Sequence, residues 1–220
     1  MTPRPDDVKP PRPYHSPIRA ERALAHRRSI LEAAHGAFLA DGYARTSVAS
    51  IAARVGVSED LVYKHFRNKR GLLVEVLNFA ATGEPDSPRV LEQQGPREVR
   101  RERDQRRQVA MFSEDVAGRV SRVRPVDDVL RSAAEVDPAL AAKRAEMHET
   151  RWDNMRAFVG WVAANGPLRE GVDVEAAATT VWTLTSPEVH RLLVDVRGWE
   201  HEEYAAWLRA TIEAALLSPS

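Results

Sequence analysis

Apolar residues recur along this chain at intervals of three and four, the spacing of one face of an α-helix. The first run predicts a helix ending near Asp41-Gly42, where glycine tolerates the left-handed conformation that closes helices; its apolar members are Ile30, Ala33, Ala34, Ala37 and Phe38. The same spacing continues almost to the end of the chain, and no useful stretch alternates apolar and polar residues as a half-buried strand does. The pattern predicts an all-α fold.

Capping residues divide this pattern into separate helices. Thr46, Ser58 and Asn68 each precede an apolar run and carry a side chain that can accept a bond from a free N–H of a first turn. Asp137 and Ser186 are each followed by a proline, which suits the first helical position. We expect further helices at residues 46–55, 58–66, 68–81, 97–123, 126–135, 138–165, 174–185, 187–196 and 200–217.

Proline and glycine mark two boundaries. Residues 1–17 hold six of the fourteen prolines together with basic residues and little apolar area, so residues 1–20 are expected to form a disordered, Pro-rich basic arm. Residues 82–96 contain two glycines and three prolines and are expected to be a loop with at most one short helix. The chain therefore divides into an arm (1–20), an N-terminal domain (21–81) and a larger C-terminal helical domain (82–220).

The most informative stretch is residues 46–69, with the sequence TSVASIAARVGVSEDLVYKHFRNK. Its first helix has a buried face predicted from Val48, Ile51, Ala52 and Val55. A tight turn at Gly56-Val57-Ser58 leads into a second helix, whose packing residues are Leu61, Val62 and Phe66. This is the order of a helix-turn-helix, whose second helix enters the DNA major groove while the first crosses the phosphate backbone.

Polar residues occur where such docking needs them. Hydroxyls and free N–H groups at the starts of the two helices can bind phosphate oxygens. A phenol, two ammonium groups and an imidazole follow on or just after the second helix, and acidic, apolar and lysine side chains there can contact base edges. The candidate DNA-binding residues are Arg45, Thr46, Ser47, Ser58, Asp60, Leu61, Tyr63, Lys64, His65 and Lys69.

The charge distribution permits this partner. The whole chain carries 32 basic and 32 acidic residues, but residues 1–80 hold 13 Lys plus Arg against 8 Asp plus Glu, a difference of +5 that residues 81–220 balance. A neutral total therefore does not exclude an anionic partner for the N-terminal part.

At these residues the sequence resembles the tetracycline-repressor (TetR) family of transcriptional regulators. The resemblance is carried by Phe38, Gly42-Tyr43, Thr46-Ser47-Val48, Ile51-Ala52, Gly56-Val57-Ser58, Tyr63, His65-Phe66, Lys69 and Leu72-Leu73. It implies a homodimer in which an N-terminal three-helix DNA-binding domain precedes a C-terminal domain that holds a small ligand and the dimer contacts. It also implies that Thr46, Tyr63, His65 and Lys69 touch phosphates, while residues 58–64 face bases.

Three features depart from the family pattern. Glu59 and Asp60 put two carboxylates at the start of the recognition helix, where they suit the helix dipole but repel phosphates, so one is expected to face away from DNA. Gly71 lies in a first helical turn, either as a hinge or to accommodate close packing. The arm's arginines can reach an adjacent groove, although disorder without contact is the favoured interpretation.

The helix expected from Pro138 carries a stripe that includes His148 and Trp152, whose polar hydrogens need partners when buried. Core packing explains most of this stripe, and an apolar cavity with a few polar groups is the alternative. The candidate ligand-pocket residues are Met111, Phe112, His148, Trp152, Met155, Val159 and Trp182.

The last helices carry more apolar surface than docking on one subunit needs, so they are candidates for the dimer interface that the resemblance implies. The candidate residues are Val189, Leu192, Leu193, Tyr204, Trp207, Leu208 and Ile212, and the alternative is that these residues complete the core of one subunit.

Other classes of function find little support in the sequence. There is no cysteine, no metal, phosphate-loop or hydrolase motif is present, and we expect no enzyme activity, cofactor or metal. The run REVRRERDQRR at residues 97–107 mixes both charges and is interpreted as a solvated or bridging helix face. No apolar stretch is long enough for a membrane span and no secretory signal is recognisable, which predicts a cytoplasmic protein.

Together with the helix-turn-helix pattern, the resemblance implies a homodimeric repressor that a small-molecule effector releases from double-stranded operator DNA, with no membrane partner. The alternative is a helical protein that binds or packs DNA without a ligand and without sequence preference.

Overall fold

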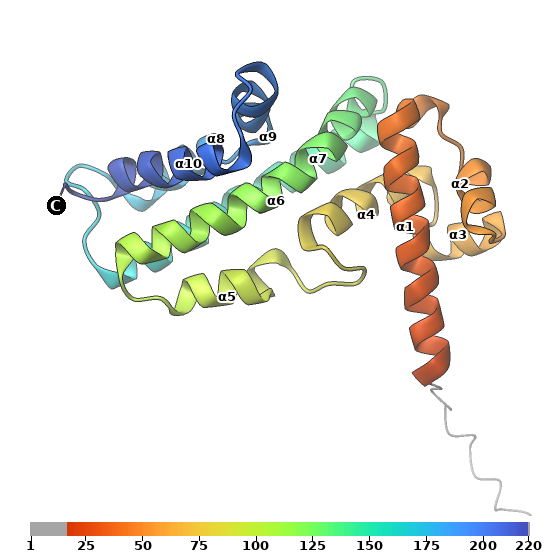
Figure 1. Cartoon of the computed structure of the whole chain (residues 1–220), viewed down its shortest axis with the longest axis horizontal. Coiled ribbons are helices and arrows are strands. Elements are labelled where there is room, and N and C mark those ends of the chain that lie inside the picture. Colours follow the sequence, from red (N-terminus) through yellow and green to blue (C-terminus); the bar gives the residue numbers. More distant parts are fainter. Residues whose placement is uncertain (1–16, 220) are drawn as a thin grey trace, which may run out of the picture.

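The computed structural model describes residues 17–219, with side chains from residue 21, and all its regular elements are helical. The predicted basic arm lies almost wholly outside the described residues, but α1 (Pro17–Arg45) already includes residues 17–20. Figure 1 shows an elongated molecule in which α1, α2 (Val48–Val55) and α3 (Glu59–Phe66) occupy the end opposite the C-terminus. Within residues 17–219 no helix is long and apolar enough to cross a membrane.

α1 has a kink at Gly42, which adopts a φ of 75° and a ψ of 168°. The sequence predicts an end to the helix at this glycine, and one further turn follows the kink before Thr46. A positive φ is strained for other residue types, so glycine here lets the chain turn toward α2.

The predicted caps are mostly correct, with one exception. Ser58 accepts a bond from Leu61 N–H at 3.3 Å, and Asn68 accepts one from Gly71 N–H at 2.9 Å, at the starts of α3 and α4 (Lys69–Thr82). The prediction that Thr46 caps α2 is wrong, because Ser47 is the cap and forms a reciprocal capping box with Ser50.

The following helices differ from the expected pattern at two points. The break predicted between residues 123 and 126 is wrong: α6 runs from Gln105 to Ala134 and passes through Pro125. Val126 and Leu130, beyond the proline, are fully buried, and this packing holds the second half of the helix in line. The real break lies before Asp104, which caps α6 after the short elements η1 (Val90–Glu92) and α5 (Gln94–Arg101).

The C-terminal elements follow the prediction closely. Asp137 caps α7 (Pro138–Asn165) by accepting bonds from Ala139 and Leu140 N–H, and Ser186 caps α9 (Pro187–His190). α8 spans Val174–Leu184, η2 is a π-helical segment from Arg191 to Val196, and α10 spans His201–Leu216.

Two apolar cores share the long helix α6. The first joins α1–α4 to the tip of the α6–α7 pair, including Val126, Leu130 and Leu140. The second joins α5, α6 and α7 to α8 and α10, and contains Phe112, Phe158 and Tyr204. The N-terminal helices therefore complete their core with residues from the tip of α6 and α7.

Candidate nucleic-acid interface and ligand cavity

The second helix of the helix-turn-helix, α3, has a buried and an exposed face. Val62 and Phe66 are buried in the first core. Tyr63, with 43% of its surface exposed, is accessible, as are Glu59, Asp60 and Lys64. Gly56, at φ 68°, forms the left-handed turn that sets α3 against α2. The exposed face can therefore approach a duplex while the other holds the helix in place.

Most of the predicted DNA-binding residues are accessible. Arg45, Ser47, Ser58, Asp60, Tyr63 and Lys64 are exposed, and Leu61, His65 and Lys69 are half-buried. The Ser58 hydroxyl caps α3 by accepting a bond, so its own hydrogen stays free to donate to a phosphate oxygen.

Thr46 is the exception, and its predicted role is corrected by the structure. It is only 3% exposed, and its hydroxyl donates within the subunit to the Gly42 carbonyl at 2.8 Å, with Ala37 O a second acceptor at 3.2 Å. The hydroxyl thus ties the start of α2 to the kink of α1 and has no donor left for a phosphate.

Lys69 and His65 have more restricted roles than the sequence predicts. The Lys69 ammonium lies 4.3 Å from the centre of the Tyr43 ring and donates to Ala44 O at 3.4 Å, and partial burial lowers its pKa. Burial, with the nearby Arg27, also lowers the pKa of His65. His65 is therefore neutral at pH 7 and can donate a hydrogen bond but not a positive charge.

Arg67 is a cation that the sequence prediction missed. It follows α3 directly, is exposed, and has a φ of 64°, which is unusual for a residue with a side chain. Its N–H closes α3 by donating to Tyr63 O at 2.7 Å. The signal in the sequence is a basic residue placed directly after a helix that carries Tyr63 and Lys64.

The structure also explains Gly71. A Cβ at this position would collide with the carbonyl oxygen of Phe66 at the end of α3. Glycine is needed because the first turn of α4 passes very close to the α3 backbone, which favours packing over a hinge as its role.

A cavity of about 330 Å³ lies among α4, α5, α6 and α7. Its walls are mainly apolar, and the Phe112 and Phe158 rings stack there with centroids 3.6 Å apart. Val74, Leu77, Asn78 and Ala81 of α4 line one side. Such a volume lies at the lower end of the range for small-molecule sites. The helix after the helix-turn-helix is thus part of the cavity wall.

Three of the predicted pocket residues, Phe112, His148 and Met155, line this cavity. The other four do not. Val159 is fully buried in the second core, and Met111 packs against that core. Trp182 stacks on Arg151, and Trp152 lies beside Arg156 on a different side of α7. The stripe read from the sequence covers more of α7 than the face that meets the cavity.

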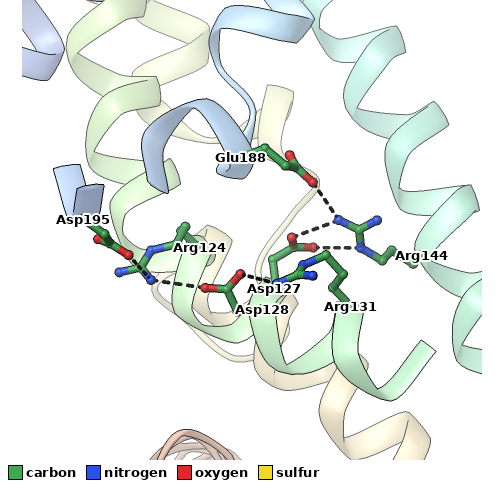
Figure 2. Close-up of polar contacts among 7 residues, drawn as sticks. All are labelled: Arg124, Asp127, Asp128, Arg131, Arg144, Glu188 and Asp195. Atoms are coloured by element: carbon green, nitrogen blue, oxygen red, sulfur yellow. Dashed lines mark hydrogen bonds and ion pairs between the residues drawn. The ribbon is translucent and has the colours of Figure 1, made fainter. Parts of the chain in front are cut away.

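The cavity also has polar residues that the sequence prediction did not include, among them Asp127, Arg144, Arg151 and Asn154. Figure 2 shows Arg144 of α7 between Asp127 of α6, at 3.1 Å, and Glu188 of α9, at 3.0 Å. Arg124 of α6 forms an ion pair with Asp195 of η2 at 2.8 Å. These ion pairs hold the short α9–η2 segment against α6 and α7.

The predicted dimer surface is corrected in part. Tyr204, Leu208 and Ile212 are fully buried within the subunit and cannot meet a partner. Leu192 is 50% exposed, and Val189, Leu193 and Trp207 are half-buried. Val196, four residues after Leu192, is 63% exposed and was not among the predicted residues. The accessible apolar residues of this region therefore belong mostly to η2.

The run of residues 97–107 has the bridging character expected, although it is not one helix. Arg103 donates to Asn165 Oδ1 at 3.3 Å, Arg106 pairs with Glu213 at 3.4 Å, and Arg107 pairs with Glu102 at 3.1 Å. Within residues 17–219 no group of three or more acidic or histidine side chains is arranged to hold a metal ion.

Comparisons with known proteins agree with this geometry. Residues 30–76 match the family described as "Bacterial regulatory proteins, tetR family". The probable HTH-type transcriptional regulator ArpR of Pseudomonas putida is 26% identical over 211 residues, which is 91% of this chain and 96% of that protein.

Solved structures share the fold. NalD, the secondary repressor of the MexAB-OprM multidrug efflux pump in Pseudomonas aeruginosa, aligns with a TM-score of 0.66 at 22% identity, over 91% of this chain and 100% of that one. A putative transcriptional regulator from Saccharomonospora viridis in complex with choline aligns with a TM-score of 0.67 at 19% identity, over 89% and 99%. Residues 30–76, which include the helix-turn-helix, therefore belong to the TetR family of bacterial regulatory proteins, and about nine tenths of the chain has the fold of these two solved structures.

Proposed function

We propose that this protein is a homodimeric transcriptional repressor that binds operator DNA through α2 and α3 and leaves it when a small molecule occupies the cavity. The observation that carries the proposal is the position of α4. This helix begins three residues after α3 ends, and its later turns form a wall of the cavity. A ligand in the cavity therefore touches the helix that supports the DNA-contacting helix.

The DNA-binding half of the proposal is supported by the exposed face of α3. Tyr63, Lys64 and Arg67 offer a hydroxyl and two cations, while Ser47 and Ser58 present hydroxyls at the starts of the two short helices. In a dimer, two copies of α3 separated by ~34–36 Å would meet successive major grooves. Glu59 and Asp60 are also exposed, and an acidic residue at this place can accept from cytosine N4.

The ligand-response half is supported by contacts that pass along α4. Lys69, at its first position, holds Tyr43 and Ala44 of α1, while Leu77 and Ala81 line the cavity. A ligand that displaces the end of α4 shifts the start as well, since helices move as rigid units, and so alters the spacing of the two recognition helices. Coupling of this kind is typically worth ~1–3 kcal/mol.

The relatives support regulation rather than catalysis, since one is a repressor by name and another was solved with choline. A cytoplasmic location follows from the proposed function, because operator DNA lies there. We assign the dimer contacts to the η2 region, around Leu192 and Val196, with Val189, Leu193 and Trp207 beside them.

The test is selection of bound duplexes from a random pool by the full-length protein, repeated with candidate small molecules. The expected result is a pseudo-palindromic sequence, protected in footprinting at two half-sites one helical turn apart, and released by at least one compound. Uniform coating of all sequences, lost gradually with salt, would instead favour the ligand-independent DNA-packing function. A recovered operator that every cavity-binding compound leaves bound would contradict the release mechanism.

A further inference from the structure

The cavity contains a guanidinium that lacks a carboxylate partner. Four cationic side chains line the cavity, namely Arg119, Lys143, Arg144 and Arg151. A ligand can recruit a buried cation only if that cation is not already neutralised, so the partners of each one indicate what chemistry the cavity can bind.

Three of the four cations are paired. Arg144 is held between Asp127 and Glu188, as Figure 2 shows. Arg119 pairs with Asp115 at 3.0 Å and also donates to Gln93 Oε1 at 3.1 Å. Lys143 pairs with Glu146 at 2.6 Å at the exposed side of α7.

Arg151 differs from these three. Its Nη1 donates to Trp182 O at 2.6 Å, near the C-terminal end of α8, and its Cζ lies 4.5 Å from the centre of the Trp182 ring. Its Nη2 is buried and has no hydrogen-bond partner among the described residues. Burial lowers the pKa of Arg151 to about 10 even though Glu188 and Asp127 attract it from a distance. The side chain is therefore undercompensated, and a bound anion would supply the missing negative charge.

The surroundings define the rest of the ligand. Met155 and the stacked Phe112 and Phe158 rings provide an apolar wall. His148 and Asn154 line the cavity three residues before and after Arg151 on α7. Burial, with Arg144 and Arg151 nearby, lowers the pKa of His148, so at pH 7 it offers a hydrogen bond without a charge.

We propose that the effector is an apolar molecule with a single carboxylate, and that this carboxylate is bound by Arg151 with help from His148 and Asn154. The inference rests on the proposed function in that it names the effector class for the same cavity. The carboxylate pairs with the guanidinium, and the hydrocarbon part lies against the phenylalanine rings.

The test uses isothermal titration calorimetry of the full-length protein, without DNA, with matched trios of small molecules. Each trio shares a carbon skeleton and differs only in its head group: octanoate, octanamide and octylamine, and phenylacetate, phenylacetamide and phenethylamine. The carboxylate is expected to bind ~10–100-fold more tightly than its amide, since a hydrogen bond to a charged group is stronger than a neutral one. The amines are expected not to bind.

Variants then identify the residue responsible. R151Q keeps a donor for Trp182 O but removes the charge, and it is expected to lose the preference for carboxylate over amide. R151K keeps the charge and is expected to retain part of that preference. R156Q removes an arginine from the same helix outside the cavity lining and is expected to bind like the parent. Circular dichroism melts establish that each variant is folded.

The possible results separate this inference from the proposed function. Amides or amines that bind as tightly as the carboxylates, a trio series in which nothing binds, or an unchanged preference in R151Q would overturn the inference. If a neutral compound binds and releases the operator, the proposed function holds without the inference. If carboxylates bind through Arg151 but never change operator affinity, the inference stands and the release mechanism fails.

Discussion

The Nε of Arg70 in α4 lies 2.6 Å from Oδ2 of Asp137, the residue that caps α7. The same carboxylate accepts bonds from Ala139 and Leu140 N–H, and the bond from Arg70 is the largest cause of its lowered pKa. The Asp137 side chain therefore both caps α7, which forms one wall of the cavity, and binds α4, the helix that follows the recognition helix.

R70Q and D137N are each expected to weaken the response to ligand, because both remove this link while asparagine preserves the cap of α7. The ligand concentration for half-release of operator DNA should rise about two- to tenfold in each variant. Fluorescence anisotropy of labelled operator, titrated with ligand, measures this. The double variant should need the same ligand concentration for half-release as either single variant. If its increase instead equals the product of the two single increases, the two residues act independently and their pair is not the link.

Lys64 and Tyr63 are expected to have different effects on DNA binding. K64A should remove the preference for guanine at one position of each half-site, a loss of ~1–3 kcal/mol of discrimination. Y63F should weaken binding to all sequences equally, since a phenol that contacts phosphate carries no base information. Competition binding with operators that vary at single positions compares them. Equal changes in base preference would contradict the assignment.

Thr46 should affect stability and not DNA contact. T46V removes the hydroxyl that donates to Gly42 O and Ala37 O and is expected to cost ~1–3 kcal/mol of unfolding free energy. T46S keeps the hydroxyl and serves as the control. Urea unfolding measures the loss. The operator affinity of the folded T46V protein should equal that of the parent. A loss of operator affinity without a loss of stability would instead support a contact between Thr46 and phosphate.

Two glycines in helices should respond oppositely to alanine. G71A places a Cβ against the Phe66 carbonyl and is expected to destabilise the protein by ~1–3 kcal/mol. G36A, in the middle of α1 with open space around its Cβ position, should stabilise it by ~0.5–1 kcal/mol. Chemical denaturation of the two variants makes a matched comparison. A neutral G71A would mean that α4 can move away from α3 at little cost.

The protein is expected to lose stability in mild acid because four of its histidines are buried or partly buried. Burial lowers the pKa of His35, His65, His148 and His190, so the unfolded chain binds protons more readily than the folded one. The contribution of these neutral histidines to the free energy of unfolding is present above the ordinary histidine pKa of about 6.5, and it is lost as the pH falls below that value. Urea midpoints across this range should fall with pH, and H190Q should flatten the slope. A midpoint that rises on acidification would contradict these directions.

Local signals predicted the helix-turn-helix well because its geometry is fixed by nearest neighbours in the sequence. Ser58 caps α3 and Gly56 turns the chain without help from distant residues. The error between Thr46 and Ser47 arose because both side chains can cap a helix. Only the packing of α1 determines that Thr46 faces inward.

Distant packing decided what the sequence pattern left open. Tyr204 and Leu192 are both large and apolar, yet only the arrangement of α7, α8 and α10 buries the first and leaves the second exposed. Similarly, two helices were predicted on either side of Pro125, and packing of Val126 and Leu130 in the first core keeps α6 continuous there. Arg151 gave no sequence signal, since its missing partner is a property of the folded surroundings.

The shared first core limits how this regulator can be divided or recombined. Residues 21–81 would lose Val126, Leu130 and Leu140 if transplanted onto an unrelated sensor module, leaving an uncovered apolar patch on α1 and α4. A chimaera must therefore carry the α6–α7 tip together with residues 21–81. A new DNA sequence specificity is better introduced by exchanging side chains on α3 than by exchanging whole segments.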